Sequence, residues 1–346
     1  GFVGLLHPTH ALILRGGAPL FAPPRRGPRS TPAACCSRTP GYPAGRGLLV
    51  TPARSRGRAR PEDPPDFLRR LGVTPRKALG QHFLTDELLL SRIADACELA
   101  PGETVVEVGV GPGGLTRELV ERTGSVVGVE IDEELAAVAR RQLAGSGACI
   151  VPADILGVTP AELLEECGAE PPYVMAGNLP YYITQPVIRR FLEADPAPRR
   201  IVVMVQREVA RRMVGGPGRE SVLSLSIGAY GVPELLYDVP SSAFWPEPDV
   251  QSAVVRIDRR PAPAVPLPPE QIARFFLLVR AGFAEPRKQL HNGLRSALGL
   301  TREQTHAVLA AAGIDPALRP QHLDLGDWQR LHARVESAHP GALDVG

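Results

Sequence analysis

The tetrapeptide Asn178-Leu179-Pro180-Tyr181 combines residue types that could hold a flat ring bearing an amine. The Asn178 side-chain oxygen can accept a hydrogen bond from an amino group. Pro180 has no N–H and biases Leu179 toward an extended backbone, so the Leu179 carbonyl could act as a second acceptor. The Tyr181 ring offers a face on which a base can stack. The pattern indicates recognition of an aromatic amine, and the simpler alternative is a proline turn with a packed tyrosine.

The tetrapeptide follows an apolar run at residues 173–176, which predicts a buried strand ending in Gly177. It therefore lies just past the carboxyl end of a strand. Open α/β sheets bind their ligands at that edge.

A glycine-rich turn lies earlier, between a β-branched run at residues 104–108 and a helical pattern at residues 115–122. The order strand, glycine turn, helix is typical of the nucleotide-binding part of a doubly wound sheet. Gly109 and Gly111 let the backbone turn sharply and approach a ligand closely. The turn predicts a nucleotide site.

Two carboxylates follow the next two predicted strands. Glu130 comes directly after the strand at residues 125–129, where it could accept hydrogen bonds from ribose hydroxyls. Asp154 comes after a strand at residues 148–151. It could accept from an adenine amino group, or it could be the N-cap of a helix.

Two classes of cofactor fit this section of the chain. Gly109, Gly111 and Gly114, with Glu130 downstream, have the spacing of a dinucleotide site, so NAD binding is one interpretation. The other is a methyl donor built on adenosine. The tetrapeptide after the fourth strand favours the methyl donor.

Gln81 and His82 lie between apolar neighbours, just before a helix predicted at residues 86–97. We expect Thr85 to be the N-cap of this helix. The two polar residues could line a ligand pocket, although a histidine before a helix is more often a surface or capping group.

The remaining patterns predict a second half of the sheet and a helical region. Expected strands lie at residues 201–205, 221–230 and 251–257, and the last two could pair antiparallel. A proline-rich loop between them holds Phe244 and Trp245. Predicted helices lie at residues 183–192, 206–214, 271–283, 288–298, 302–312 and 325–337.

Basic side chains gather in two stretches and predict contacts with RNA phosphates. The first set is expected to form a basic rim and comprises Arg189, Arg190, Arg199, Arg200, Arg207, Arg211 and Arg212. The second set lies in the helical region and comprises Arg287, Lys288, His291 and Arg295, with the neutral Asn292 among them.

The composition is that of an ordinary globular protein, with 346 residues, 44% hydrophobic and 22% charged residues, and a net charge of +2. The five cysteines are odd in number and lack CxxC spacing, which argues for a reducing compartment and against a disulfide framework or a metal site. No stretch approaches the ~18–20 apolar residues that span a bilayer. We therefore expect a cytoplasmic protein.

Residues 1–60 contain no Asp or Glu and many Arg, Pro, Gly and Ala. Such a segment cannot bury enough apolar surface to offset its ordering entropy, so we expect it to be disordered. It could be a transit peptide to a mitochondrion or plastid, or a basic arm that binds RNA. We favour a third interpretation, a translated upstream region without a role, because a transit peptide should be more amphipathic and contain less proline.

Together these motifs resemble the ribosomal RNA adenine N6-dimethyltransferase family. They occur in the family's order, at residues 80–84, 107–113, 130–132, 154, 178–181 and 244–255. His82 stands where the family more often has Asn.

The resemblance implies a fold and a set of site residues. The fold is a Rossmann-like class I methyltransferase sheet of seven strands, the last antiparallel, at residues 66–260. A basic extension (residues 1–65) would precede it and a small helical RNA-contacting domain (residues 261–340) would follow. The implied S-adenosylmethionine contacts are His82, Leu84, Gly109, Gly111, Glu130, Asp154 and Asn178. The implied catalytic residues are Asn178, Leu179, Pro180, Tyr181 and Phe244, and the RNA contacts singled out are Arg207, Arg211, Arg287 and Lys288.

The implied function is dimethylation of the N6 amines of two adjacent adenosines in a hairpin loop near the 3′ end of small-subunit rRNA, within a ribosomal particle. We expect a monomer. The alternatives are a large-subunit methyltransferase of the macrolide-resistance type, a non-catalytic relative serving as a mitochondrial transcription factor, and the NAD oxidoreductase.

Overall fold

The computed structural model describes residues 64–76, 79–180 and 182–344. The predictions for residues 1–60 and for Tyr181 lie outside this described part. Within it, no helix is long and apolar enough to cross a membrane.

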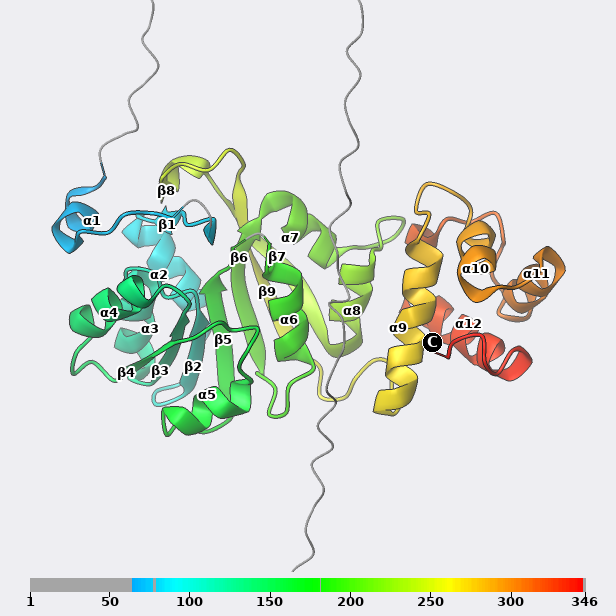
Figure 1. Ribbon diagram of the computed structural model, residues 1–346, viewed down its shortest axis with the longest axis horizontal. Helices are drawn as coiled ribbons and strands as arrows, with labels where there is room; N and C mark the ends of the chain where they lie inside the picture. Colours follow the sequence, from blue (N-terminus) through cyan, green and yellow to red (C-terminus); the bar gives the residue numbers. More distant parts are fainter. Residues whose placement is uncertain (1–63, 77–78, 181, 345–346) are drawn as a thin grey trace, which may run out of the picture. The chain divides into compact units, whose positions relative to one another are not determined.

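A mixed sheet of seven strands forms the centre of the fold (Figure 1). Its strands lie in the order β4-β3-β2-β5-β6-β9-β7, and the pairs that involve β9 are antiparallel while the others are parallel. The strands are β2 (Thr104–Val108), β3 (Val126–Glu130), β4 (Ala148–Pro152), β5 (Tyr173–Asn178), β6 (Arg200–Gln206), β7 (Gly231–Val239) and β9 (Ser252–Arg259). The predicted Rossmann-like sheet with its last strand antiparallel is confirmed.

Helices cover both faces of this sheet (Figure 1). They are α2 (Glu87–Ala96), α3 (Gly114–Thr123), α4 (Glu133–Gln142), α5 (Pro160–Glu166), α6 (Thr184–Leu192), α7 (Arg207–Val214) and α8 (Val222–Tyr230), preceded by a short α1 (Asp66–Leu71).

Alternate residues of the central strands enter two different cores. Val105 and Val174 pack with residues of α2 and α3, whereas Val106 and Met175 pack with residues of α5 and α6. Because both faces are buried, the strands are nearly continuous apolar runs. This is why the sequence predicts their positions well.

The C-terminal helices enclose a separate core around Phe275 and Trp328. They are α9 (Pro269–Phe283), α10 (Leu290–Leu298), α11 (Arg302–Ala311) and α12 (Leu325–Ala338), as predicted apart from their ends. Gly282 of α9 lets this core close, because a Cβ there would lie 2.3 Å from the Trp328 ring. The described residues belong to one compact unit, and the domain boundary at residue 260 stays a prediction.

The prediction of a strand at residues 221–230 is wrong, because these residues form α8. A capping box starts the helix: the Ser221 hydroxyl accepts from the Ser224 N–H, and the Ser224 hydroxyl accepts from the Ser221 N–H. The antiparallel partners of β9 are instead the next segment, β7, and β6.

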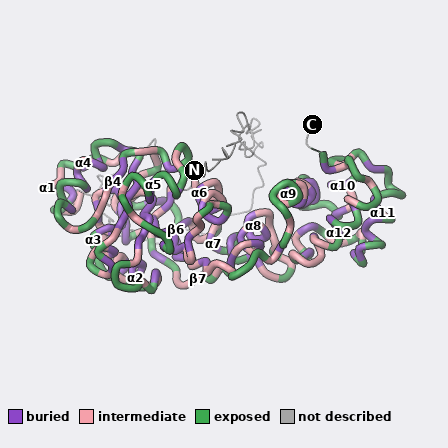
Figure 2. The backbone as a smooth tube through the Cα atoms, turned by 90° about the horizontal axis from the view of Figure 1, so that it is seen from below, coloured by how far each residue is buried: buried purple, intermediate pink, exposed green. Residues whose placement is uncertain are grey.

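The burial of α8 explains the error. None of its residues is exposed (Figure 2). Leu223 and Ile227 belong to a core of the sheet, whereas Leu225 and Ala229 belong to the core of the C-terminal helices. A helix that is apolar all round lacks the one-sided pattern by which amphipathic helices are recognised.

Thr85 is not the N-cap of α2. The cap is Asp86, whose side chain accepts from the Leu89 N–H at 3.1 Å. Thr85 instead donates twice to the Ala243 carbonyl, through its N–H (2.9 Å) and its hydroxyl (3.1 Å). Thr85 therefore joins the start of α2 to the loop before Phe244.

Two cysteines form a disulfide, which the odd cysteine count argued against. Cys149 of β4 is bonded to Cys167, the C-cap of α5, with their Cα atoms 5.9 Å apart. Cys97 is a buried free thiol. Spacing alone did not predict the pair, because α5 packs back onto β4 from a separation of 18 residues.

We expect reduction of this disulfide to lower the melting temperature, because closing a loop of this length stabilises a fold by about 3 kcal/mol in the chain-entropy account. Calorimetry with and without reductant measures the effect. The double variant Cys149→Ser/Cys167→Ser is the control, and reductant should leave its melting temperature unchanged. Titration of five free thiols in the unreduced, unfolded chain would contradict the assignment.

Candidate active site

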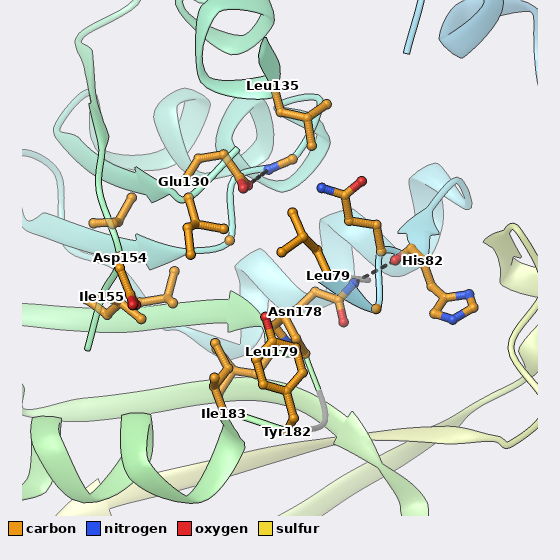
Figure 3. A pocket seen from close by; sticks show the side chains of 18 of the residues that line it. Leu79, His82, Glu130, Leu135, Asp154, Ile155, Asn178, Leu179, Tyr182 and Ile183 are labelled. Atoms are coloured by element: carbon orange, nitrogen blue, oxygen red, sulfur yellow. Dashed lines mark hydrogen bonds between the residues drawn. The ribbon is translucent and has the colours of Figure 1, made fainter. Parts of the chain in front are cut away.

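A cavity of about 1010 Å³, including solvent at its mouth, opens where β2, β3, β4 and β5 end (Figure 3). Parallel strands bring their carboxyl ends to one edge, so residues far apart in the sequence meet there. Of the residues predicted for the site, those lining this cavity are His82, Gly109, Gly111, Glu130, Asp154, Asn178, Leu179, Pro180 and Phe244.

Leu84 does not line this cavity. It lines a smaller one of about 360 Å³, which shares Gly109, Gly111 and Asn178 with the first. The predicted cofactor residues are thus divided between two adjoining cavities that share the glycine turn.

The glycine turn has a backbone that other residues rarely adopt. Gly109 and Gly111 have φ of +80° and +56°. Between them, the Val110 side chain packs against Gly128 of β3, where a Cβ would lie 2.6 Å from a Val110 methyl carbon. The turn therefore fits closely onto the sheet and presents backbone to the cavity.

Glu130 is held by main-chain donors. Its Oε2 accepts from the Gly111 N–H at 2.8 Å, and its Oε1 accepts from the Asp132 N–H at 2.9 Å. Burial raises the pKa of this carboxyl group, and the two main-chain donors oppose the rise. Each oxygen can accept a further hydrogen bond, so Glu130 suits a pair of hydroxyl donors such as those of ribose.

Asp154 is not the cap of a helix. Its Oδ1 accepts from the Leu156 N–H at 2.9 Å in a local turn, and α5 begins only at Pro160, with Thr159 as its cap. Asp154 lines the cavity beyond β4, which leaves its second oxygen as a candidate acceptor for a ligand.

Three apolar or aromatic residues that the sequence analysis did not single out also line the cavity. Ile131 is 50% exposed, Leu156 is 37% exposed and Tyr182 is 60% exposed. Exposed apolar side chains beside a cavity are suited to covering a flat ring. The signal was present in the sequence, because Ile131 and Leu156 follow the strand-end carboxylates Glu130 and Asp154 within two residues.

Asn178 is the last residue of β5, and its amide group has a defined orientation. Its Nδ2 donates to the main-chain carbonyl of His82 at 3.1 Å. A carbonyl can only accept, so the amide nitrogen must face His82. The amide oxygen therefore lies on the other side of the group (Figure 3).

The approach of β5 to β2 depends on Gly177. A Cβ at this position would lie 2.4 Å from the Val108 carbonyl oxygen. Leu179, immediately after the strand, is buried, and its N–H donates to the Met204 carbonyl of β6 at 3.1 Å. The Leu179 carbonyl accepts no hydrogen bond from the described residues, so it remains a candidate acceptor.

Phe244 and Leu84 belong to a small two-stranded sheet. It pairs β1 (Phe83–Leu84) with β8 (Phe244–Trp245) in antiparallel register. Phe244 is buried yet contributes to the wall of the cavity. The ring nitrogen Nδ1 of His82 lies 2.7 Å from the Pro246 carbonyl oxygen just beyond β8.

The segment before β1 is fixed to the N-terminus of α4. Asp132, the cap of α4, is buried and accepts from Gln81 at 3.2 Å, and Arg76 forms an ion pair with it at 3.2 Å. The Arg76 N–H also donates to Gln81 at 2.7 Å. These contacts hold Leu79 and Gly80, which line the cavity, against the sheet.

Glu107 of β2 is a buried carboxyl group beside the smaller cavity. It is 1% exposed, and its Oε2 has no hydrogen-bond partner among the described residues. Burial, with a contribution from the negative charge of Glu130, raises the pKa of Glu107 to about 8. This group therefore carries a proton at neutral pH in the folded chain.

The residues predicted to contact RNA have different surroundings. Arg207 forms an ion pair with Asp238 at 3.1 Å and a hydrogen bond to Gln251 at 2.8 Å. Arg211 and Arg287 are exposed and form no ion pair with a described residue. Lys288 pairs with Glu285 at 2.7 Å. The two exposed arginines are therefore the ones whose charge is not engaged within the described chain.

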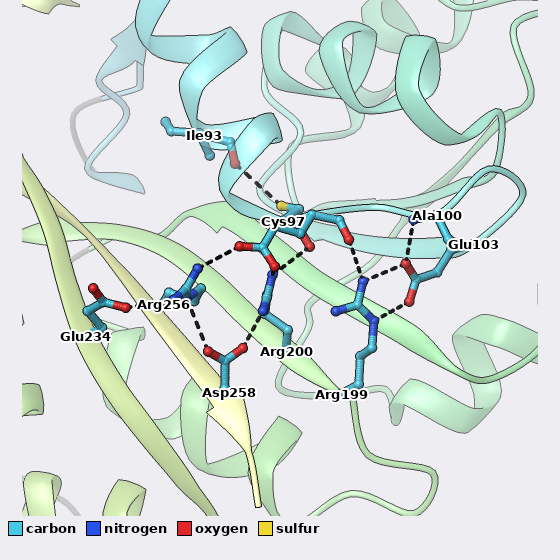
Figure 4. Close-up of polar contacts among 10 residues, drawn as sticks. Ile93, Cys97, Ala100, Glu103, Arg199, Arg200, Glu234, Arg256 and Asp258 are labelled. Carbon is cyan, nitrogen blue, oxygen red and sulfur yellow. Dashed lines mark hydrogen bonds and ion pairs between the residues drawn. The ribbon is translucent and has the colours of Figure 1, made fainter.

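The predicted basic rim is wrong for Arg199 and Arg200, which lie at the amino end of β6, opposite the end at which the cavity opens. Figure 4 shows the polar contacts that engage both side chains. Arg199 pairs with Glu103, and Arg200 pairs with Glu98 and Asp258 at 2.6 Å each. These ion pairs connect strands and loops at the far end of the sheet.

Arg189 and Arg190 are also engaged within the chain. Arg189 pairs with Glu193 at 2.9 Å, and Arg190 donates to the Val158 carbonyl at 2.7 Å. Their contribution to a basic surface is reduced accordingly.

Comparison with known proteins gives one consistent result. A family model described as ribosomal RNA adenine dimethylase matches residues 72–335. A protein of Dehalococcoides mccartyi strain 195 named ribosomal RNA small subunit methyltransferase A is 44% identical over 257 residues, which are 74% of this chain and 87% of that protein. A protein of the same name from Moorella thermoacetica is 39% identical over 278 residues, covering 78% and 96%.

Solved structures agree with this result. The crystal structure of the 23S rRNA methyltransferase ErmE matches with a TM-score of 0.58 and 31% identity, and covers 73% of this chain and 99% of that one. A dimethyladenosine transferase from Plasmodium falciparum has the same TM-score at 21% identity, which shows the fold alone.

We expect the stability difference between the wild type and a Glu107→Gln variant to depend on pH. In the folded chain Glu107 keeps its proton up to about pH 8, whereas its ordinary pKa is 4.5. Unfolding therefore releases a proton between these values, and the wild type loses stability as pH rises through this window. Within this pH window, the free energy of unfolding of Glu107→Gln should rise relative to that of the wild type by at most about 1.4 kcal/mol per pH unit.

Urea unfolding at a series of pH values measures this difference. Glu121→Gln, at an exposed position of α3, is the matched control and should give a curve parallel to the wild type. Parallel curves for Glu107→Gln as well would show that the buried carboxyl group does not titrate as described.

Proposed function

The chain belongs to the ribosomal RNA adenine dimethylase family, and we propose that its targets are two neighbouring adenosines in a hairpin loop near the 3′ end of the small-subunit rRNA. Membership makes it an rRNA adenine N6-dimethyltransferase that uses S-adenosylmethionine. The curated relatives of 44% and 39% identity are named for the small subunit, whereas the structure of 31% identity is named for 23S rRNA. These identities favour the small-subunit substrate.

One observation carries the proposed chemistry. The His82 carbonyl holds the Asn178 amide nitrogen, so the amide oxygen is left as an acceptor at the tip of β5. The Leu179 carbonyl follows it directly in the chain. Two acceptors at one strand tip match the two N–H groups of an adenine amine.

The described residues fit S-adenosylmethionine. Glu130, with a lone pair left on each oxygen, suits the ribose hydroxyls, and Asp154 suits the adenine amino group. Ile131 and Leu156 could cover the faces of the adenine ring. The positive φ of Gly111 brings the backbone close to the ligand without a side chain. When bound, the cofactor supplies an electrophilic methyl group on a sulfonium.

The chain's own residues contribute mainly by positioning. Asn178 Oδ1 and the Leu179 carbonyl would accept the two N–H groups of the target amine and hold it in one orientation. In that orientation the nitrogen lone pair is drawn out of conjugation with the ring and directed toward the methyl group. The amine proton becomes acidic only after the transfer, so no side chain is needed as a base of shifted pKa. Catalysis then consists of orientation and preorganised acceptors.

Aromatic side chains would cover the faces of a target adenine that has been flipped out of its stack in the RNA. Phe244 lines the cavity and offers one wall. Tyr181, outside the described residues, is proposed as the other. The Tyr182 side chain, 60% exposed, also lies at the cavity.

The RNA contacts are proposed for Arg211 and Arg287 before Arg207 and Lys288, because the last two are engaged with carboxylates within the chain. Residues 261–340 are proposed as the helical RNA-contacting domain. We also propose that the substrate is rRNA within a ribosomal particle, that the enzyme acts as a monomer and that it works in the cytoplasm.

Methylation in vitro tests the substrate. Small and large ribosomal subunits that lack the modification would be incubated with labelled S-adenosylmethionine and the purified chain, and the products digested and identified by mass spectrometry. We expect N6,N6-dimethyladenosine at two adjacent positions of the small-subunit RNA. Dimethylation of the large subunit alone would reject the proposed substrate, and no incorporation into either would reject the proposed reaction.

Substitution of Asn178 tests the acceptor arrangement. Asn178→Ala removes the acceptor and should lower kcat by about 10²–10³-fold, as when one preorganised polar group is removed elsewhere. Asn178→Asp keeps an oxygen but cannot donate to the His82 carbonyl, so it should also be strongly impaired. Affinity for S-adenosylhomocysteine, measured calorimetrically, should fall much less. Wild-type turnover by Asn178→Asp would refute the orientation argument.

A further inference from the structure

The aromatic wall at Phe244 packs in the core that α2 and α3 share with the sheet, but its main-chain pairing is limited. In the described chain its strand, β8, pairs only with β1 and not with the seven-stranded sheet. The wall and the acceptor at Asn178 therefore belong to different sheets. Their separation depends on the packing of Phe244 in that core and on the contacts between the segment around β8 and β5.

His82 contacts both the acceptor residue Asn178 and the segment that carries the Phe244 wall. Its main-chain carbonyl accepts from the Asn178 amide at 3.1 Å, and its ring Nδ1 lies 2.7 Å from the Pro246 carbonyl oxygen. Pro246 directly follows β8 and is separated from His82 by 164 positions in the sequence. One residue thus joins the acceptor to the segment that carries the wall.

The donor and the acceptor of the contact between His82 Nδ1 and the Pro246 carbonyl are fixed. The Pro246 carbonyl can only accept, so His82 Nδ1 carries the proton and donates. Nδ1 is bonded to Cγ, as is the amide nitrogen of an asparagine. Asn can therefore place a donor at nearly the same point, whereas Gln places it one bond farther out and Leu has no donor.

The second methyl transfer depends more on the hydrogen bond between His82 and Pro246 than the first transfer does. An unmodified adenine amine has two N–H groups for the two acceptors, whereas the monomethylated amine has one. The intermediate therefore loses one of its hydrogen bonds to the site. Its orientation depends correspondingly more on the ring walls.

We propose that the His82 side chain is a positioning residue that, through Pro246, holds the Phe244 wall at a fixed distance from Asn178 and thereby sustains the second methyl transfer. The proposal rests on the proposed adenine dimethylation. The ring of His82 acts through the Phe244 wall and does not contact the reacting atoms.

The test compares His82→Leu, His82→Gln and His82→Asn by the rates of first and second transfer and by the ratio of mono- to dimethyladenosine. We expect Leu and Gln to accumulate monomethyladenosine, with the second transfer slowed roughly tenfold, as for loss of one hydrogen bond, and the first slowed much less. Asn should restore the wild-type ratio. Affinity for S-adenosylhomocysteine should change little in all three, since the main-chain carbonyl of residue 82 remains.

Thr85→Val is the matched control. It removes a side-chain hydrogen bond to the same segment, at Ala243, while the main-chain bond from the Thr85 N–H to that carbonyl persists. We expect its product ratio to match the wild type. A purely structural role of these contacts would make Thr85→Val and His82→Leu behave alike, and that result would overturn the proposal.

Hydrogen exchange of residues 243–247 provides a readout independent of activity. Exchange should rise in His82→Leu and His82→Gln and return to the wild-type level in His82→Asn. Unchanged exchange in Leu and Gln, an unchanged product ratio, or equal slowing of both transfers would each overturn the proposal. A wild type that does not methylate rRNA would instead reject the proposed function, and the exchange measurement would still decide whether the link exists.

Discussion

The hydrogen bond from Asn178 to the His82 carbonyl is the contact on which the site depends. The two ends of a carboxamide have nearly the same shape, so packing alone would leave the direction of its oxygen undecided. A main-chain carbonyl can only accept, and it therefore fixes the nitrogen on one side and the oxygen on the other. The direction of the acceptor is set by a group that no side-chain substitution removes.

Two glutamates at the same edge of the sheet have different surroundings. Glu130 ends β3 and receives two main-chain N–H donors, which favour its charged form against burial. Glu107 lies inside β2 without a partner for its Oε2 among the described residues, and burial raises its pKa to about 8. One carboxyl group is thus prepared to accept from a ligand, while the other is kept neutral by its surroundings.

Much of the fold and the site could be predicted from local patterns. Strands buried on both faces appear as apolar runs, and residues that follow such runs meet at one edge, which placed Glu130, Asp154 and Asn178 around one cavity. The helix at residues 222–230 was missed because it is buried all round. Arg200 was assigned to the wrong edge because it is the first residue of its strand, and the start of a parallel strand lies opposite its end.

The sequence by itself determined the doubly wound sheet, its glycine turn and the types of residue at the strand ends, because these follow from burial and backbone freedom within a few positions. Only the tertiary structure decided which way the Asn178 amide points, that His82 reaches Pro246 from 164 positions away, and that Cys149 meets Cys167. Those contacts join segments whose separation along the chain carries no information about their distance in space. They are set by how the segments pack on the sheet, and local propensity does not encode that.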